Sequence, residues 1–237
     1  MIPVGYVSSP YREKFAVPRQ PGLASTVVSE IVMEPPYDDM DAFRGIEQFS
    51  HLWIIFEFSL VSEKSCFRPL IRPPRLGGNA RLGVFASRSP FRPNRIGLSV
   101  VRLIEVIRSD GKTKVRFSGG DLVDRTPIYD IKPYIAFSDS IPDSLCGIAS
   151  FPPDRRRVEF STEAETFISS LDQQKYPGLK DIVSDILSYD HRPAYRTDGE
   201  DVNIYGVALY DFNIRFRYLA DVTEVVGLEY LPDGSHS

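Results

Sequence analysis

The stretch LSVVRLIEVIRSDGKTKVRFSGG, residues 98–120, decides the fold that this sequence predicts. Its two halves, 98–109 and 113–120, are short runs rich in β-branched residues and bounded by small or polar residues. This composition is typical of β-strands. Between the halves, Ser109-Asp110-Gly111 has the character of a tight hairpin turn. The sequence therefore predicts two antiparallel strands joined by a short turn.

Three other runs in the first 140 residues have the same character. They are STVVSEIVME (25–34), HLWIIFEFSL (51–60) and ARLGVFASR (80–88). No amphipathic pattern of ten residues interrupts them, and residues 37–49 predict at most one short turn of helix. Many short strands without alternating helices favour an antiparallel sheet that closes on itself. No GxGxxG motif follows a strand, which disfavours a parallel nucleotide-binding sheet. We expect a mainly β protein, built on a single-sheeted antiparallel β-barrel.

The pattern of the sequence changes after residue 160. STEAETFISSLDQQ (161–174) begins with a capping box formed by Thr162 and Glu165, and LKDIVSDILSY (179–189) has the spacing of an amphipathic helix. Residues 202–231 return to alternation and predict two or three strands. We therefore expect a small α+β C-terminal domain. The expected organisation is a barrel domain over 1–140, a connector over 141–160 and the C-terminal domain over 161–237.

Composition excludes several classes of protein. The 237 residues are 42% hydrophobic and 12% aromatic, enough for a folded core. No stretch is long and apolar enough to span a bilayer, and no basic segment precedes an apolar run at the N-terminus. Two cysteines and three histidines are scattered without the spacing of metal ligands. We expect a soluble, cytoplasmic protein without a metal site.

Arginines gather in one acid-free segment of an otherwise acidic chain. RPPRLGGNARLGVFASRSPFRPNRIGLS (72–99) holds six arginines and no carboxylate, although the net charge of the chain is -4. A local cluster sets the local field whatever the net charge is. The planar guanidinium binds carboxylates and phosphates through two hydrogen bonds at once. Prolines in the same segment restrict the path of its loops. The segment therefore predicts an anion-binding surface.

Six blocks of the chain, in a fixed order, carry a resemblance to a known family. They are SPYREKFAVPRQPGL (9–23), FSHLWIIFEF (49–58), the arginine segment (72–99), DLVDRTPIYDIKPY (121–134), RPAYR (192–196) and YDFNIRFRY (210–218). Together they resemble the TsaA family, whose characterised bacterial members are called TrmO. The resemblance implies a methyltransferase that uses S-adenosylmethionine and methylates N6 of the threonylcarbamoyl-adenosine just 3′ of the tRNA anticodon. It also implies a β-barrel with a small C-terminal domain, and a homodimer.

The resemblance further implies which residues hold the methyl donor. These are Arg19, Gln20, Pro21, Gly22, Leu23, Arg88, Leu98, Leu122, Val123, Asp124 and Arg125. From the residues alone, Pro21-Gly22 is equally well read as a plain tight turn. The chain departs from the family pattern at two positions: the family often has proline where this chain has Arg95, and glycine where it has Arg125.

Methyl transfer from a sulfonium is an in-line displacement, so holding donor and acceptor in position is the main requirement. The N6 atom of the modified adenosine is a weak nucleophile, because its lone pair is delocalised into a urea group. A carboxylate near N6–H would help. Asp124 and Asp130 are the motif carboxylates that we nominate. A turn-stabilising role for Asp124, next to Thr126-Pro127, is the competing interpretation.

The tRNA itself offers phosphates and a threonyl carboxylate. The candidate groups that bind it are Arg72, Arg75, Arg81, Arg92, Arg192, Tyr195, Arg196 and Arg215. Rings and guanidiniums read unstacked RNA bases. We expect about half of the arginines in the 72–99 segment to brace loops instead. The alternative to an enzyme is a non-catalytic barrel that binds RNA or a nucleotide; hydrolysis is disfavoured, since no nucleophile–base pair is visible.

Overall fold

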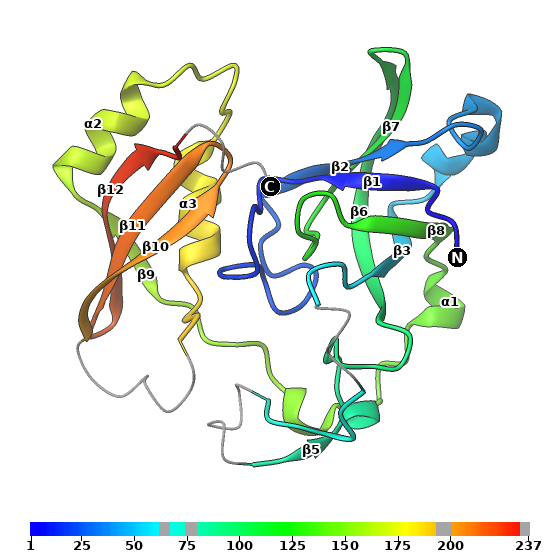
Figure 1. Cartoon of the computed structure of the whole chain (residues 1–237), viewed down its shortest axis with the longest axis horizontal. Helices are drawn as coiled ribbons and strands as arrows, with labels where there is room; N and C mark the ends of the chain where they lie inside the picture. The colour runs from blue at the N-terminus through cyan, green and yellow to red at the C-terminus, as the bar shows by residue number, and fades with distance from the viewer. Residues whose placement is uncertain (62–66, 74–79, 193–200, 233–237) are drawn as a thin grey trace.

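The computed structural model describes residues 1–61, 67–73, 80–192 and 201–232. Figure 1 shows two bodies side by side, a barrel that contains most of the N-terminal half and a C-terminal sheet with two helices against it. A two-stranded hairpin, β4 (Leu70–Ile71) with β5 (Leu82–Gly83), extends below the barrel in this view. No helix among these residues is long and apolar enough to cross a membrane. The expected mainly β architecture is confirmed.

Six strands form the closed barrel, in the order β1-β2-β7-β6-β3-β8. They are β1 (Gly5–Ser8), β2 (Val28–Met33), β3 (His51–Glu57), β6 (Ile96–Ser109), β7 (Lys112–Ser118) and β8 (Pro127–Pro133). All the pairings are antiparallel, and β1 closes the ring by pairing with β8. Alternate residues point inward, as on β3, where Leu52, Ile54 and Phe56 are buried. One apolar core fills the barrel.

The predicted hairpin between β6 and β7 is confirmed. Ser109 pairs with Lys112, and the two residues between them have positive φ, 54° at Asp110 and 76° at Gly111. Two successive positive φ angles are characteristic of a type I′ turn, whose twist matches that of the flanking strands.

Several elements of the first 140 residues differ from the sequence prediction. Strands β1 and β8 were not foreseen, because β1 has only four residues and β8 has a proline at each end. The expected strand over 80–88 is wrong, except at Leu82–Gly83. The chain there turns into a short 3₁₀ helix, η4 (Val84–Ala86), in which the Ser87 N–H donates back to the Val84 carbonyl.

Short helical turns join the strands of the barrel. The predicted turn within 37–49 is present as two 3₁₀ helices, η1 (Met40–Phe43) and η2 (Ile46–Gln48). After β8 the chain forms α1 (Ala136–Asp139) and η5 (Gly147–Ala149).

The C-terminal sheet has the order β10-β11-β12-β9. Its strands are β9 (Arg157–Phe160), β10 (Asp201–Leu209), β11 (Phe212–Leu219) and β12 (Val222–Tyr230), and its helices are α2 (Thr162–Ser170) and α3 (Leu179–Leu187). Strand β9 lies within the stretch expected to be a connector and pairs in parallel with β12. The cap of α2 is Ser161, one residue before the predicted one, because its hydroxyl accepts from the Ala164 N–H.

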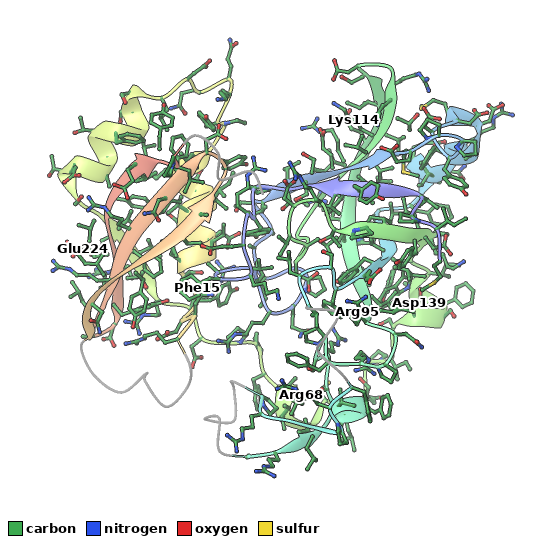
Figure 2. All side chains as sticks on the ribbon, viewed as in Figure 1. Phe15, Arg68, Arg95, Lys114, Asp139 and Glu224 are labelled. Atoms are coloured by element: carbon green, nitrogen blue, oxygen red, sulfur yellow. The ribbon has the colours of Figure 1, made fainter. Side chains whose placement is uncertain are left out.

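Residues 10–27, called the strap below, leave the barrel after β1 and run along the C-terminal sheet before returning to β2. Tyr11 and Ala16 are buried in the core of the C-terminal sheet, as are Ala24 and Val27. Figure 2 shows Phe15 beside this sheet, where its ring stacks with that of Phe216 at 6.4 Å. The strap therefore connects two barrel strands in the sequence, but its buried side chains pack in the core of the C-terminal sheet.

The strap also covers the open edge of the C-terminal sheet. Strand β10 is one of the two edge strands of this sheet, and Tyr11 makes a β-bridge to Leu209 on it. The Tyr210 N–H donates to the Pro10 carbonyl at 2.9 Å, and the Ala208 N–H donates to Glu13 Oε1 at 2.9 Å. Backbone groups of an uncovered edge would otherwise be open to pairing with another chain.

A buried carboxylate on α3 fixes the far end of the strap. Oδ2 of Asp185 accepts from the Thr26 backbone N–H at 3.1 Å and from the Thr26 hydroxyl at 2.9 Å. Its Oδ1 pairs with Arg155 at 2.9 Å, and only 6% of the Asp185 side chain is exposed. One carboxylate therefore joins the strap, α3 and the segment before β9.

We expect Asp185→Ala to lower the free energy of unfolding by about 1–3 kcal/mol, because it removes a buried carboxylate that accepts two hydrogen bonds from Thr26 and pairs with Arg155. Urea denaturation measures this loss. Asp181→Ala, on the exposed face of the same helix, is the matched control and should lose less than about 1 kcal/mol. Equal losses in the two variants would contradict the role of Asp185.

Candidate functional site

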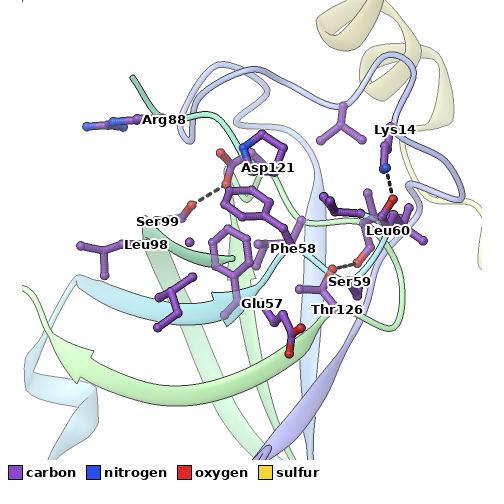
Figure 3. A pocket seen from close by; sticks show the side chains of 18 of the residues that line it. Lys14, Glu57, Phe58, Ser59, Leu60, Arg88, Leu98, Ser99, Asp121 and Thr126 are labelled. Atoms are coloured by element: carbon purple, nitrogen blue, oxygen red, sulfur yellow. Dashed lines mark hydrogen bonds between the residues drawn. The ribbon is translucent and has the colours of Figure 1, made fainter. Parts of the chain in front are cut away.

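A cavity of about 560 Å³ opens at one end of the barrel. Its walls come from the strap, the end of β3, the loop before β6, the start of β6 and the segment after β7 (Figure 3). The lining residues include Lys14, Arg19, Gln20, Phe56, Glu57, Phe58, Leu60, Arg88, Arg92, Leu98, Ser99, Asp121, Leu122 and Val123. Its volume is within the range of sites for small organic ligands.

Aromatic and aliphatic side chains make the floor of the cavity. The rings of Phe56 and Phe58 meet edge to face at 5.1 Å. Phe56 lies directly against Gly97 of β6, where any Cβ would overlap its ring. Leu98, the next residue, is 51% exposed and lines the cavity. An apolar floor of this kind suits a flat heteroaromatic ring.

Polar groups lie at both ends of the cavity. At one end the Arg88 guanidinium donates to Gln20 Oε1, which joins the segment before β6 to the strap. At the other end Lys14 of the strap donates to the Leu60 carbonyl. Both cations are on the cavity wall, so a ligand with an anionic group is accommodated at either end.

Two of the described lining residues are carboxylates, and their surroundings differ. Oε1 of Glu57 pairs with Arg95 at 2.8 Å, and its Oε2 accepts from the Tyr129 hydroxyl, which raises the pKa of Tyr129 to about 12. Asp121 accepts at Oδ1 from the Ser99 hydroxyl at 2.6 Å. Burial raises the pKa of Asp121, against the lowering effects of the Ser99 hydrogen bond and of Arg88.

The structure brings together part of the set that the resemblance assigned to the methyl donor. Arg19, Gln20, Arg88, Leu98, Leu122 and Val123 all line the cavity. Pro21, Gly22, Leu23, Asp124 and Arg125 are not among its lining residues. Gly22 has φ of 81° and donates from its N–H to the Gly119 carbonyl at 2.7 Å, so it turns the strap back toward β2. The Leu23 carbonyl accepts from Arg155 and Tyr189.

The two carboxylates nominated as proton acceptors do not line the cavity. Asp124 pairs with Arg12 at 2.7 Å and accepts from the Ser9 N–H at 2.9 Å, so both of its oxygens are engaged. Asp130 pairs with Lys132 at 3.0 Å and accepts from the Ile131 N–H. The structure therefore places Asp124 in a bracing position, and Asp130 on the outside of the barrel wall, 48% exposed.

The arginine segment divides into bracing and exposed side chains. Arg92 donates to the carbonyls of Val84 and Ser87, at 3.1 Å and 2.7 Å. Arg95 donates to the Val61 carbonyl at 3.0 Å as well as pairing with Glu57. Arg72 and Arg81 are exposed, and Arg75 lies outside the residues that the structure describes. The expected bracing by some of these arginines is confirmed.

Both departures from the family pattern stand where φ is positive. At Arg125 φ is 61°, a conformation that glycine adopts without cost and that other residues adopt rarely. At Arg95 φ is 48°, which the ring of a proline cannot reach. The loop before β6 therefore follows a path in this chain that proline at this position would not permit.

The candidate tRNA-binding residues of the C-terminal domain are less accessible to a ligand than the sequence indicated. Arg192 is 1% exposed, pairs with Asp190 at 2.7 Å and lies 4.2 Å above the Tyr218 ring. On β11 the aromatic side chains are buried, while Arg215 and Arg217 share the other face and lie near Glu163 and Glu224. Tyr195 and Arg196 belong to the segment 193–200, which the structure does not describe.

Sequence reasoning missed Asp121, Glu57, Phe58 and Lys14 as cavity residues. All four are within or next to the blocks quoted above, and Asp121 directly precedes the nominated Leu122. The pairing of β6 with the end of β7, which places Ser99 beside Asp121, has no signal in the sequence. Among the described residues, no group of three or more His, Cys, Asp or Glu side chains is placed to hold a metal ion.

Comparison with known proteins gives consistent results over the whole chain. Residues 6–140 match the tRNA-methyltransferase O N-terminal domain, and residues 153–231 match the TrmO C-terminal domain. The chain is 47% identical to the tRNA (adenine(37)-N6)-methyltransferase of Escherichia coli, over 95% of this chain and 96% of that protein. It is 41% identical, over the same shares, to a Pseudomonas aeruginosa protein described by inference as an S-adenosylmethionine-dependent methyltransferase.

A solved structure agrees with these relatives. The crystal structure of TrmO from Pseudomonas aeruginosa matches this fold with a TM-score of 0.79, at 35% identity, and covers 96% of both chains. Both family domains, the high identity from end to end and the shared fold lead to one conclusion. The chain belongs to the TrmO family of S-adenosylmethionine-dependent tRNA (adenine(37)-N6)-methyltransferases.

Proposed function

We propose that this chain methylates N6 of the adenosine just 3′ of the tRNA anticodon, and that this adenosine already carries a threonylcarbamoyl group. The observation that carries the proposal is the end-to-end identity of 47% with a tRNA (adenine(37)-N6)-methyltransferase, in a chain whose barrel has a cavity of about 560 Å³ lined by apolar and charged side chains. The cavity also argues against a module that only binds RNA, because such a module needs no enclosed site for a small molecule.

The residues of the cavity fit S-adenosylmethionine. The donor is part heteroaromatic, part cationic at sulfur and part amino acid, and it supplies an electrophilic methyl group when bound. Phe56, Phe58 and Leu98 offer the apolar surface that the adenine needs. The faces of the Phe56 and Phe58 rings suit the sulfonium charge. Arg88 and Gln20 would hold the carboxylate of the amino acid part. We keep Arg19, Leu122 and Val123 as cavity-wall residues of this site.

The modified base supplies a second anionic group, the threonyl carboxylate. The exposed arginines of the acid-free segment, Arg72 and Arg81, lie on a surface without competing carboxylates between residues 64 and 104. They would bind this carboxylate or the phosphates of the anticodon loop. The C-terminal part would extend the contact with tRNA through Arg215 and through Arg196 and Tyr195. In this organisation residues 1–140 carry the chemistry, 161–237 contact tRNA and 141–160 connect them.

We further propose that the chain acts in the cytoplasm as a homodimer. Large apolar side chains are exposed within residues 135–151, after the barrel closes: Phe137 is 93% exposed, Leu145 is 101% exposed and Phe151 is 82% exposed. Monomeric proteins seldom leave so many large apolar side chains open to water in one short segment. A second copy of the chain would cover them.

Labelled S-adenosylmethionine and two tRNA preparations test the proposed reaction. One preparation carries threonylcarbamoyl-adenosine beside the anticodon, and the other is an unmodified transcript. We expect label to enter only the first, with the methyl group on N6. Label in both would remove the requirement for the prior modification. Label in neither would contradict the proposed acceptor.

We expect Arg88→Ala to lower methyl transfer about tenfold or more without unfolding the protein, because a hydrogen bond to a charged group contributes about 1.5–3 kcal/mol. Initial rates with the modified tRNA and the thermal midpoint measure the two effects. Arg108→Ala, on the far hairpin of the barrel, is the matched control and should keep the wild-type rate. Unchanged turnover in the Arg88 variant would remove this residue from the site.

We expect Leu145→Glu to convert the homodimer to a monomer, because a charge cannot be buried between two copies without a partner. Sedimentation velocity measures the change. Ile204→Glu, at an exposed position of the C-terminal sheet, is the control and should leave the dimer intact. A monomeric wild-type protein would contradict the proposed assembly.

A further inference from the structure

Of the two carboxylates that the described residues place on the cavity wall, only one has an oxygen left for a ligand. Glu57 holds Arg95 with Oε1 and accepts from Tyr129 with Oε2, so both of its oxygens are engaged. Asp121 uses Oδ1 for Ser99 at 2.6 Å. No hydrogen bond to Asp121 Oδ2 is found within the described part of the chain. Figure 3 shows Asp121 beside Ser99, between Arg88 and Phe58.

The position of Asp121 is fixed from both sides. It directly precedes Leu122, which is 2% exposed in the barrel core, and its Oδ1 is held by Ser99 of β6, itself 2% exposed. A side chain that is held in one orientation loses little entropy when a ligand arrives. Oδ2 is therefore an acceptor placed on the cavity wall in advance.

The reaction needs such an acceptor. N6 of the threonylcarbamoyl-adenosine carries one hydrogen, and its lone pair is delocalised into both the ring and the urea carbonyl. When the N6–CH₃ bond forms, the methyl carbon–sulfur bond breaks and its electron pair stays on sulfur, which becomes a neutral thioether. The N6–H bond must also break to leave a neutral product. Removal of this proton as the new bond forms raises the nucleophilicity of N6.

We propose that Oδ2 of Asp121 accepts the N6 proton during methyl transfer and that Asp121 is thus the catalytic base. This rests on the function proposed above. The carboxylate becomes a carboxylic acid as the N6–CH₃ bond forms, and it releases the proton to solvent when the methylated tRNA leaves. The assignment replaces Asp124 and Asp130, whose oxygens are engaged by Arg12 and Ser9 in the first case and by Lys132 and the Ile131 N–H in the second.

The groups around Asp121 support this role. Burial raises its pKa, so the carboxylate is a stronger base than one in water. The hydrogen bond from Ser99, the backbone N–H of Asp121 and the charge of Arg88 act in the opposite direction. Burial, and after it the charges of Asp185 and Asp121, raise the pKa of Tyr11 in the strap, so its phenol stays neutral. A poorly solvated carboxylate with a raised pKa suits a weakly acidic N–H.

Asp121→Asn tests the proposal with an almost isosteric side chain. We expect kcat for the modified tRNA to fall about 100-fold. The dissociation constants of S-adenosylmethionine and of the modified tRNA, measured separately by calorimetry, should each stay within about twofold. Asp110→Asn, an exposed carboxylate on the far hairpin, is the control that should keep the wild-type kcat. Asp130→Asn tests the rival carboxylate.

Ser99→Ala gives a second, independent readout. In the wild type, kcat should fall as the pH drops through the pKa of Asp121, because the protonated acid cannot accept a proton. Loss of the Ser99 hydrogen bond removes an interaction that lowers this pKa, so the fall in kcat should move to higher pH while its plateau remains. In Asp121→Asn this acid limb should disappear. A merely structural role of Asp121 would neither shift the acid limb in Ser99→Ala nor abolish it in Asp121→Asn.

Three outcomes would overturn the assignment. Asp121→Asn could lose affinity for S-adenosylmethionine while its kcat at saturating donor is unchanged, which would make Asp121 a donor ligand. Asp130→Asn could show the large fall in kcat instead. Ser99→Ala could leave the acid limb in place, and this variant decides the question should Asp121→Asn fail to fold. An inactive wild type on modified tRNA would contradict the proposed function itself, which separates the two failures.

Discussion

The attachment of the strap to the C-terminal sheet is the constraint on which the site depends. Residues 10–27 bury Tyr11 and Val27 in the second core, and Asp185 holds Thr26 from helix α3. Between these anchors the strap carries Lys14, Arg19 and Gln20 to the wall of the cavity. One side of the cavity is therefore positioned by a sheet that is more than a hundred residues away in the sequence.

This arrangement links the two ends of the proposed enzyme. The part of the chain proposed to contact tRNA also holds the loop that closes the cavity, so any shift of β10 or α3 moves the strap with it. Arg19 makes long hydrogen bonds to the carbonyls of His191 and Arg192, directly before the segment with Tyr195 and Arg196. These hydrogen bonds join Arg19 on the cavity wall to His191 and Arg192.

Short-range patterns in the sequence correctly predicted those helices, strands and turns that are determined by interactions between neighbouring residues. The hairpin at Asp110-Gly111 and the amphipathic helix α3 depend on turn geometry and on spacing, and both were confirmed. Strands β1 and β8 were missed because they are held by their neighbours in the ring, not by their own composition. The segment 80–88 has the composition of a strand, yet Arg92 draws its carbonyls into a turn instead.

The same distinction applies to the site. Arg88 and Leu98 were predicted from the family resemblance, and the structure places both on the cavity wall. Asp121 was not predicted as a base. Its suitability depends on its burial and on one unengaged oxygen, and neither property can be read from a sequence. Asp124 and Asp130 have equally suggestive positions in the motif, but the ion pairs that engage them form only in the folded chain.

Gly97 and Phe56 show how closely the cavity constrains substitution. Because a Cβ at position 97 would overlap the Phe56 ring, the two positions share one volume across β6 and β3. Alanine at position 97 requires a smaller residue at position 56, and that pair would lower the floor and enlarge the space for the donor. The two positions should therefore change together during evolution, and a double-mutant cycle would find their effects strongly non-additive. A residue larger than glycine at position 97 is thus possible only after the ring at position 56 has been replaced by a smaller side chain.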